Sequence, residues 1–332
     1  MSQGSPASLV SIITATYNWS SVLRYSIRTA LWQTCHDFEM LIIGDGCTDD
    51  SEQVVASFGD PRLHWHNLPQ NSGSQSAPNN VGLEMARGTY IAYLGHDDVW
   101  YPTHLAHLVK TLQETGADIA YSLAAALGPP GSGFERITGV SPFGEYERGL
   151  ILPPSSVMHK RELTGDIGGW KDFRTISLPP DQELWVRAWD RGKRFARVDE
   201  LTVFKFNSAW RKNSYIEKPS HEQEAYVRRI ESEPDFLYRE TLARLKGSIL
   251  QCAHLIMQTP EEMYERPSGE TVNEFRKNRG LSPLESPYFF RRMFRRGIRR
   301  IDRALGHHPR RILQRMFRML DGVKVDSLRI CR

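Results

Sequence analysis

Two adjacent carboxylates, Asp97 and Asp98, follow the apolar run at residues 90–94 after Gly95 and His96, and they precede Val99 and Trp100. An apolar run of this length is typical of a buried strand, so the two acids should lie where a strand ends. Carboxylates placed together suit a hard divalent cation, which in turn holds phosphate oxygens. The pair therefore indicates a site for a phosphorylated ligand.

The first half of the chain alternates apolar segments with helical patterns, which predicts the elements that position this pair. We expect strands and helices in alternation, the strands at residues 9–15, 38–43 and 89–94 and the helices at residues 20–33, 80–86 and 104–115. This order favours an α/β fold with a mostly parallel sheet, and such sheets bind ligands beyond the carboxyl ends of their strands. Asp45 follows the second predicted strand, so it should lie at the same edge as the Asp pair.

A third acid, Asp181, follows Pro179 and Pro180 and opens a predicted helix with apolar Leu184 and Trp185 on one face. A single Asp at a helix start is most often an N-cap. The residue pattern alone therefore leaves both an N-cap and a catalytic role open for Asp181.

The composition is that of an ordinary globular protein, with 332 residues, 40% hydrophobic and 25% charged, and a net charge of +4. This length accommodates one large domain with an appendage. The four cysteines have no C-x-x-C spacing, and no basic segment precedes the first apolar run, so we expect a reduced, cytosolic setting without a signal peptide. No apolar stretch approaches the ~20 residues that span a bilayer.

In their order and context these acids resemble the family 2 inverting glycosyltransferases of GT-A fold. The resemblance extends over residues 8–210 and is carried by short segments at residues 10–18, 33–34, 38–39, 44–51, 71–73, 79–83 and 86–91. It implies that Ala15, Thr16 and Tyr17 shape a pocket for a nucleotide base. It also implies that Asp45 accepts a hydrogen bond from a pyrimidine N–H, which favours a UDP- or dTDP-linked donor.

The resemblance further implies roles for the remaining acids. Asp97 would contact the ribose or sugar, Asp98 would bind Mn²⁺ or Mg²⁺ bridging the diphosphate, and Asp181 would be the general base. Such chemistry needs positive charge on the leaving diphosphate and a carboxylate that takes the proton of the acceptor hydroxyl.

This chain departs from the family pattern at one position, because Gly95 stands where the family usually has its first acid. Lys205, Arg211 and Lys212 follow the Asp181 helix. A cation from this region could hold the leaving diphosphate, or all three could be surface charges.

Beyond a catalytic domain at residues 1–215, we expect a helical C-terminal extension at 216–262, with Ser220 and Gln223 in capping-box positions, and a linker at 263–287. A basic amphipathic tail should follow at 288–332, since residues 288–318 contain eleven Arg and a single acid. Cationic amphipathic helices favour an anionic membrane surface, here through residues 288–320. Packing or oligomerisation is the alternative, and nucleic acid is not expected because no recognition motif accompanies the run.

The sequence thus predicts a cytoplasmic, peripherally membrane-bound glycosyltransferase that moves a sugar from a nucleotide-diphosphate sugar to a saccharide or lipid-linked acceptor in cell-envelope glycan synthesis. Two alternatives stay open. One is a catalytically silent nucleotide-sugar-binding or scaffold subunit, which the loss of an acid at Gly95 favours. The other is a nucleotidyltransferase, although the segment after the first strand lacks the Gly-rich, basic loop of that class.

Overall fold

The computed structural model describes residues 8–131, 135–141, 145–208, 211–244 and 272–284. The strands are β1 Val10–Thr16, β2 Phe38–Gly44, β3 Leu63–Asn67, β4 Tyr90–Tyr93, β5 Val99–Trp100, β6 Ile119–Leu127, β7 Glu135–Thr138, β8 Val157–Lys160 and β9 Phe195–Phe206. The helices are α1 Ser20–Leu31, α2 Ser51–Ala56, α3 Ser76–Met85, α4 His104–Thr115, α5 Leu163–Ile167, α6 Pro180–Asp190, α7 Ser214–Glu217, α8 His221–Ser232 and α11 Val272–Asn278. Two 3₁₀ turns lie at Pro154–Ser156 and Phe173–Thr175.

One mixed sheet of nine strands forms the centre of the molecule, in the order β3-β2-β1-β4-β8-β6-β9-β5, with β7 paired to β6. The pairs β3–β2, β2–β1 and β1–β4 are parallel, as is β6–β9. β8 is antiparallel to both β4 and β6, and β5 is antiparallel to β9. The expected α/β fold is confirmed, but only the first half of the sheet is parallel throughout.

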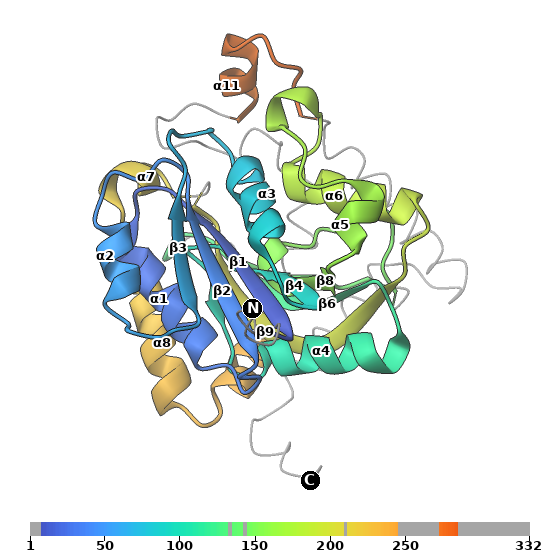
Figure 1. The fold of residues 1–332 in the computed structure, drawn as a ribbon. Helices are drawn as coiled ribbons and strands as arrows, with labels where there is room; N and C mark the ends of the chain where they lie inside the picture. Colours follow the sequence, from blue (N-terminus) through green and yellow to red (C-terminus); the bar gives the residue numbers. More distant parts are fainter. Residues whose placement is uncertain (1–7, 132–134, 142–144, 209–210, 245–271, 285–332) are drawn as a thin grey trace, which may run out of the picture.

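Helices cover both faces of this sheet (Figure 1). Successive residues of β1 point to opposite faces, so Ile12 packs in a core with Leu23 of α1 and Leu108 of α4, while Ile13 packs on the other side. That second core includes Trp185 of α6. Burial on both faces explains why apolar residues of β1 occupy adjacent positions, as at Ile12 and Ile13, rather than only alternate ones.

The predicted elements of the first half are present with boundaries shifted by a few residues. Helix α4 has the predicted bounds and ends at Gly116, whose φ of +64° is the left-handed conformation that glycine favours after a helix. Although residues 125–154 are rich in Gly, Pro and Ser, β6 extends to Leu127 and β7 lies within this segment.

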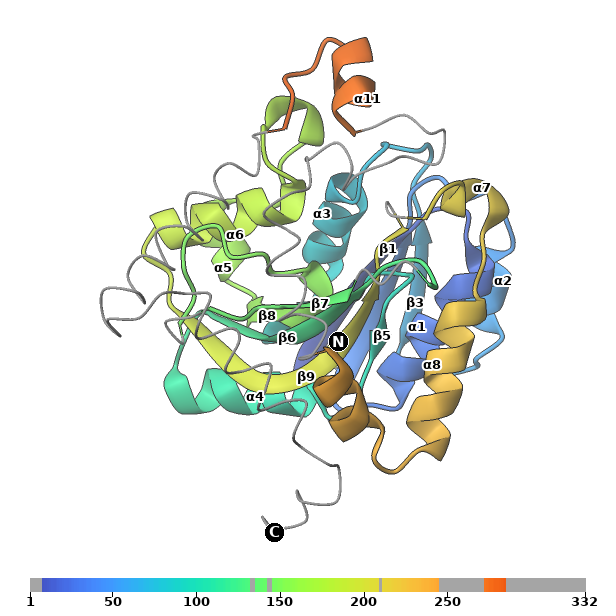
Figure 2. The same ribbon diagram turned by 180° about the vertical axis from the view of Figure 1, so that it is seen from behind.

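The C-terminal helices do not form one long element. Helix α8 ends at Ser232, just before Pro234, and helical structure resumes at residues 236–244. Val227 and Phe236 from these two helical pieces pack in one core with Phe204 of β9, and α8 lies beside α1 (Figure 2). The expected boundary near residue 215 therefore does not separate two cores.

The segment expected to be a linker contains helix α11. The Arg276 guanidinium of this helix donates to the backbone carbonyls of Phe173, Ile176 and Ser282. These bonds tie residues 272–284 to the loop that precedes α6. The expected basic tail at 288–332 lies outside the described residues.

Candidate active site

The carboxyl end of β1 forms one side of the candidate site. Ala15 and Thr16 are the last residues of the strand, and Tyr17 follows with 38% of its surface exposed. The Thr16 hydroxyl lies 2.9 Å from Nδ1 of buried His96, which links the ends of β1 and β4. This contact gives His96 a structural role. Burial lowers its pKa although Asp97 and Asp98 oppose that shift, so the ring stays neutral.

The turn after β2 is joined to the same edge by Asn18. Its φ of +46° is uncommon for a residue other than glycine. In this conformation its side-chain Oδ1 accepts hydrogen bonds from the backbone N–H groups of Thr48 and Asp49, at 2.7 and 3.2 Å. The two loops predicted to hold the nucleotide base are thus fastened to each other.

Asp45 lies at the start of this turn and is 5% exposed. Both of its carboxylate oxygens accept the backbone N–H of Ser72, at 3.0 and 3.1 Å. Asp45 therefore fixes the loop at Ser72. Each carboxylate oxygen can accept a second donor, so base recognition stays a prediction.

Asp97 and Asp98 lie in the tight turn between β4 and β5, where the Asp98 N–H donates to the Gly95 carbonyl at 3.0 Å. Asp98 is fully buried, and three donors reach its carboxylate. The Ser155 hydroxyl and Lys205 Nζ donate to Oδ2 at 2.5 and 3.2 Å, and the Phe206 N–H donates to Oδ1 at 3.2 Å.

Asp97 differs from its neighbour. It is 7% exposed, and no hydrogen bond from the described part of the chain reaches its carboxylate. Its backbone carbonyl accepts the side-chain amide of Gln223 at 3.1 Å. Ser220 is the N-cap residue of α8 as predicted, but it makes no side-chain cap bond, and Gln223 holds the acid turn instead of completing a capping box.

Asp181 is the second residue of α6, and Pro179 is the N-cap position. Asp181 therefore lies near the N-cap without occupying that position, and its carboxylate interacts with the backbone N–H groups of Gln182 and of Asp181 itself. Burial raises the pKa of Asp181, and the nearby Lys205 ammonium offsets part of this effect. A carboxylate with a raised pKa is better suited to accept a proton than an ordinary surface acid.

Lys205 of β9 brings the acids into one site. Burial lowers the pKa of its ammonium, but the charges of Asp98, Asp97 and Asp181 outweigh burial and raise that pKa above its usual range. The acids come from the β4–β5 turn and the start of α6, so the three segments converge on one cation.

Arg211 and Lys212, the other two cations considered for the diphosphate, do not join this cluster of acids. Arg211 is 8% exposed and donates to the backbone carbonyls of Leu127, Gly128 and Asn207 and to the Glu222 carboxylate. All its donor groups are directed into the protein, which makes it structural. Lys212 is exposed on the surface.

A metal ion at Asp98 does not fit these contacts. The carboxylate already receives three donors, and a divalent cation there would be repelled by the Lys205 ammonium. Among the residues that the structure describes, no three His, Cys, Asp or Glu side chains are arranged to hold a metal ion. The Mn²⁺ or Mg²⁺ prediction stays a prediction.

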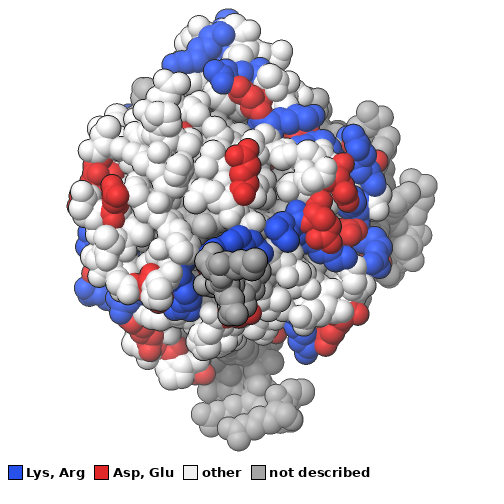
Figure 3. Space-filling model, in the orientation of Figure 1, with Lys and Arg blue, Asp and Glu red and all other residues white. Residues whose placement is uncertain are grey.

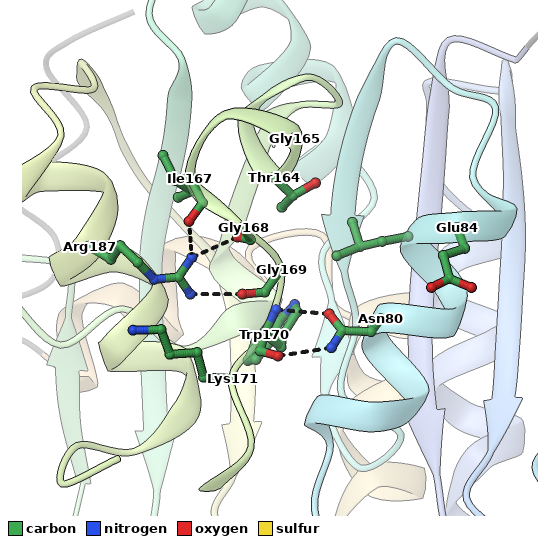
Figure 4. A pocket seen from close by; sticks show the side chains of 11 residues that line it. Asn80, Glu84, Thr164, Gly165, Ile167, Gly168, Gly169, Trp170, Lys171 and Arg187 are labelled. Carbon is green, nitrogen blue, oxygen red and sulfur yellow. Dashed lines mark hydrogen bonds between the residues drawn. The ribbon is translucent and has the colours of Figure 1, made fainter. Parts of the chain in front are cut away.

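A groove of about 550 Å³ lies between α3 and the α5–α6 segment. Figure 4 shows Asn80 and Arg187 on its two sides. Arg187 donates to the carbonyls of Ile167, Gly168 and Gly169 and pairs with Glu183, so its guanidinium braces the wall. No predicted site residue lines this groove, and we assign the chemistry to the acid cluster instead.

The surface gives no single-sign patch on the face shown in Figure 3, where basic and acidic side chains are interspersed. None of the helices described is both long enough and apolar enough to cross a bilayer. The residues expected to touch a membrane lie outside the described ranges.

Known proteins resemble this chain in sequence and in fold. The family model for glycosyl transferase family 2 matches residues 11–152. A putative teichuronic acid biosynthesis glycosyltransferase of Bacillus subtilis, TuaG, is 31% identical over 189 residues, which is 55% of this chain and 73% of TuaG. The Escherichia coli UDP-Glc:alpha-D-GlcNAc-diphosphoundecaprenol beta-1,3-glucosyltransferase WfaP is 32% identical over 34% of this chain and 45% of WfaP.

An uncharacterized glycosyltransferase of Rickettsia typhi is 34% identical over 34% of this chain, and the match spans about a third (35%) of that relative's length. Among solved structures, S. aureus TarS has a similar fold, with a TM-score of 0.51 and 18% identity over 74% of this chain and 47% of TarS. The extent of the match to TuaG, together with the family model, settles the family. The chain belongs to glycosyl transferase family 2.

Proposed function

We propose that the protein transfers a sugar from a nucleotide-diphosphate sugar to a hydroxyl of a saccharide or lipid-linked acceptor, with inversion at the anomeric carbon. One arrangement carries this proposal: Asp98 pairs with Lys205 at 3.2 Å, and the charges of Asp97 and Asp181 also act on that ammonium. A transfer of this kind needs a proton acceptor on one side of the anomeric carbon and positive charge beside the leaving diphosphate on the other.

In this proposal Asp181 takes the proton of the acceptor hydroxyl as its oxygen bonds to the anomeric carbon. The bond from that carbon to the diphosphate breaks on the opposite side, and the electron pair leaves with the diphosphate oxygen. Displacement from the opposite side inverts the anomeric centre. The raised pKa of Asp181 supports the role of base.

The donor would lie along the edge formed by the ends of β1 and β2. Ala15, Thr16 and Tyr17 would line the base pocket, Asp45 would accept a pyrimidine N–H, and Asp97 would contact the ribose or sugar. The names of WfaP and TuaG support a setting in cell-envelope glycan synthesis with a UDP-linked donor. Peripheral attachment to the inner face of the membrane through residues 288–320, with an oligomer as the alternative role for that tail, completes the proposal.

A transfer assay with a panel of UDP-, dTDP- and GDP-sugars and a thermal-shift measurement of donor binding test this function. We expect Asp181→Asn to lower turnover by about 10²–10⁴-fold, the usual contribution of a general base, while donor binding is kept. Asp190→Asn is the matched control, because Asp190 ends the same helix and pairs with exposed Arg148.

Two outcomes contradict the proposal in different ways. If Asp181→Asn turns over as fast as Asp190→Asn, Asp181 is not the base. If the wild-type protein binds a donor but neither transfers nor hydrolyses its sugar with any acceptor preparation, the silent-subunit alternative is correct.

A further inference from the structure

The Lys205 ammonium is positioned where a bound metal ion would be expected to act. Its Nζ lies 3.2 Å from Oδ2 of Asp98, and 25% of its side chain is exposed. It therefore reaches the solvent side of the site while one of its three protons is held by a buried carboxylate. Among the described residues Nζ makes no other hydrogen bond, so its remaining protons are available to a ligand.

The carboxylate of Asp98 is already occupied by hydrogen-bond donors of the protein, Lys205 among them. The Ser155 hydroxyl donates to the same oxygen as Lys205, and the Phe206 N–H donates to the other oxygen. Ser155 is itself fixed, because its Oγ accepts the Gly95 N–H at 2.9 Å. These contacts form a continuous chain from Gly95 through Ser155 and Asp98 to Lys205.

Gly95 is part of this arrangement for a steric reason. A Cβ atom at this position would lie 2.7 Å from Oδ2 of Asp98 and 3.3 Å from Oγ of Ser155. Any side chain here, including the acid that the family usually has, would displace the hydrogen bond between Ser155 and Asp98. The hydrogen bonds that anchor Lys205 through Asp98 therefore require a glycine at position 95.

We propose that Lys205 supplies the positive charge that stabilises the leaving diphosphate, and that donor binding and transfer do not require a bound divalent metal ion. This inference rests on the function proposed above. Lys205 stays protonated throughout the reaction, and its ammonium donates a hydrogen bond to the phosphate oxygen that gains the electron pair of the broken bond. The proton released by the acceptor goes to Asp181, so charge and protons balance.

Binding of nucleoside diphosphates tests the inference without relying on turnover. UDP, dTDP and GDP are titrated calorimetrically into the full-length protein in EDTA and in Mn²⁺. We expect the dissociation constant of the preferred nucleotide to differ by less than about 3-fold between the two conditions, because a resident cation needs no added metal.

Variants separate Lys205 from other lysines. In EDTA we expect Lys205→Met to weaken nucleotide binding at least 10-fold and to lower transfer by about 10²–10³-fold. Lys193→Met, which removes a half-buried lysine paired with exposed Asp166, should change neither. Thermal unfolding establishes that each variant is folded, and the comparison of EDTA with Mn²⁺ needs no variant at all.

Three results overturn the inference. The first is nucleotide binding or transfer that EDTA abolishes and Mn²⁺ restores. If Mn²⁺ then fails to restore binding in Asp97→Asn, Asp97 is the metal ligand. The second is a folded Lys205→Met variant that binds and transfers like wild type. The third is a wild-type protein that binds no nucleotide in either condition, which overturns the proposed function as well and so is distinguishable from the other two.

Discussion

The hydrogen bond from Ser155 to the buried Asp98 carboxylate gives a stability prediction that can be worked out from the structure. Ser155→Ala removes a donor to an ionised group, and such bonds contribute about 1.5–3 kcal/mol. It also removes the acceptor of the Gly95 N–H, which adds a further fraction of the cost of an unpaired amide. Because Asp98 is fully buried, water cannot replace the lost donor. We expect Ser155→Ala to lower the free energy of unfolding by about 2–4 kcal/mol.

The neighbouring Ser156 provides a matched control. It is also fully buried, but its hydroxyl donates to the Pro153 carbonyl at 2.9 Å, which is a bond between neutral groups. The same carbonyl also receives the Ser156 N–H, so Ser156→Ala leaves no acceptor unpaired. Its cost should be about 0.5–1.5 kcal/mol.

Urea unfolding of the wild-type protein and both alanine variants at pH 7, followed by circular dichroism, measures the difference. We expect the midpoint for Ser155→Ala to lie clearly below that for Ser156→Ala, with the same dependence on urea concentration. Equal destabilisation by the two substitutions would refute the reasoning, because it would mean that Asp98 is not an ionised, hydrogen-bonded anchor.

Three further predictions concern the nucleotide pocket, acid stability and the arginine excluded from the site. Asp45→Asn should weaken binding of a pyrimidine nucleotide by about 10-fold, equivalent to about 1.4 kcal/mol, and calorimetry showing unchanged affinity would contradict base recognition. Burial lowers the pKa of His104 to about 3 and of His159 to about 4. The unfolded chain therefore binds protons below pH ~6.5 that the folded protein does not, and the free energy of unfolding falls by about 1.4 kcal/mol per pH unit for each ring as the pH drops toward 4. Unfolding curves at pH 7 and 5 should show this loss. Arg211→Ala should destabilise the fold by about 3–5 kcal/mol yet leave the nucleotide affinity of the folded protein unchanged, and a selective loss of affinity would return Arg211 to the site.

Much of this site is local in the sequence and therefore predictable. The apolar run at residues 90–94 ends in Asp97 and Asp98, and the structure places a strand and a turn there. Helix periodicity gave the bounds of α4, and the β–α alternation gave the α/β class. These features follow from backbone periodicity and chain breaks over a few residues, which is the information that a short segment carries.

The role of each residue in the site depends on contacts between segments that are distant in the sequence. Ser155, Lys205 and Gln223 come from three separate elements, 57 to 126 residues away from the acids that they contact. No local sequence pattern shows that Lys205 rather than Arg211 belongs to the site, because both are cations that follow the Asp181 helix within a few residues of each other. The sequence by itself determined which acids gather at the carboxyl edge of the sheet. Tertiary packing decided that Asp98 is a buried anchor and that Lys205 is the cation it holds, since burial and hydrogen-bond partners exist only once the strands are paired.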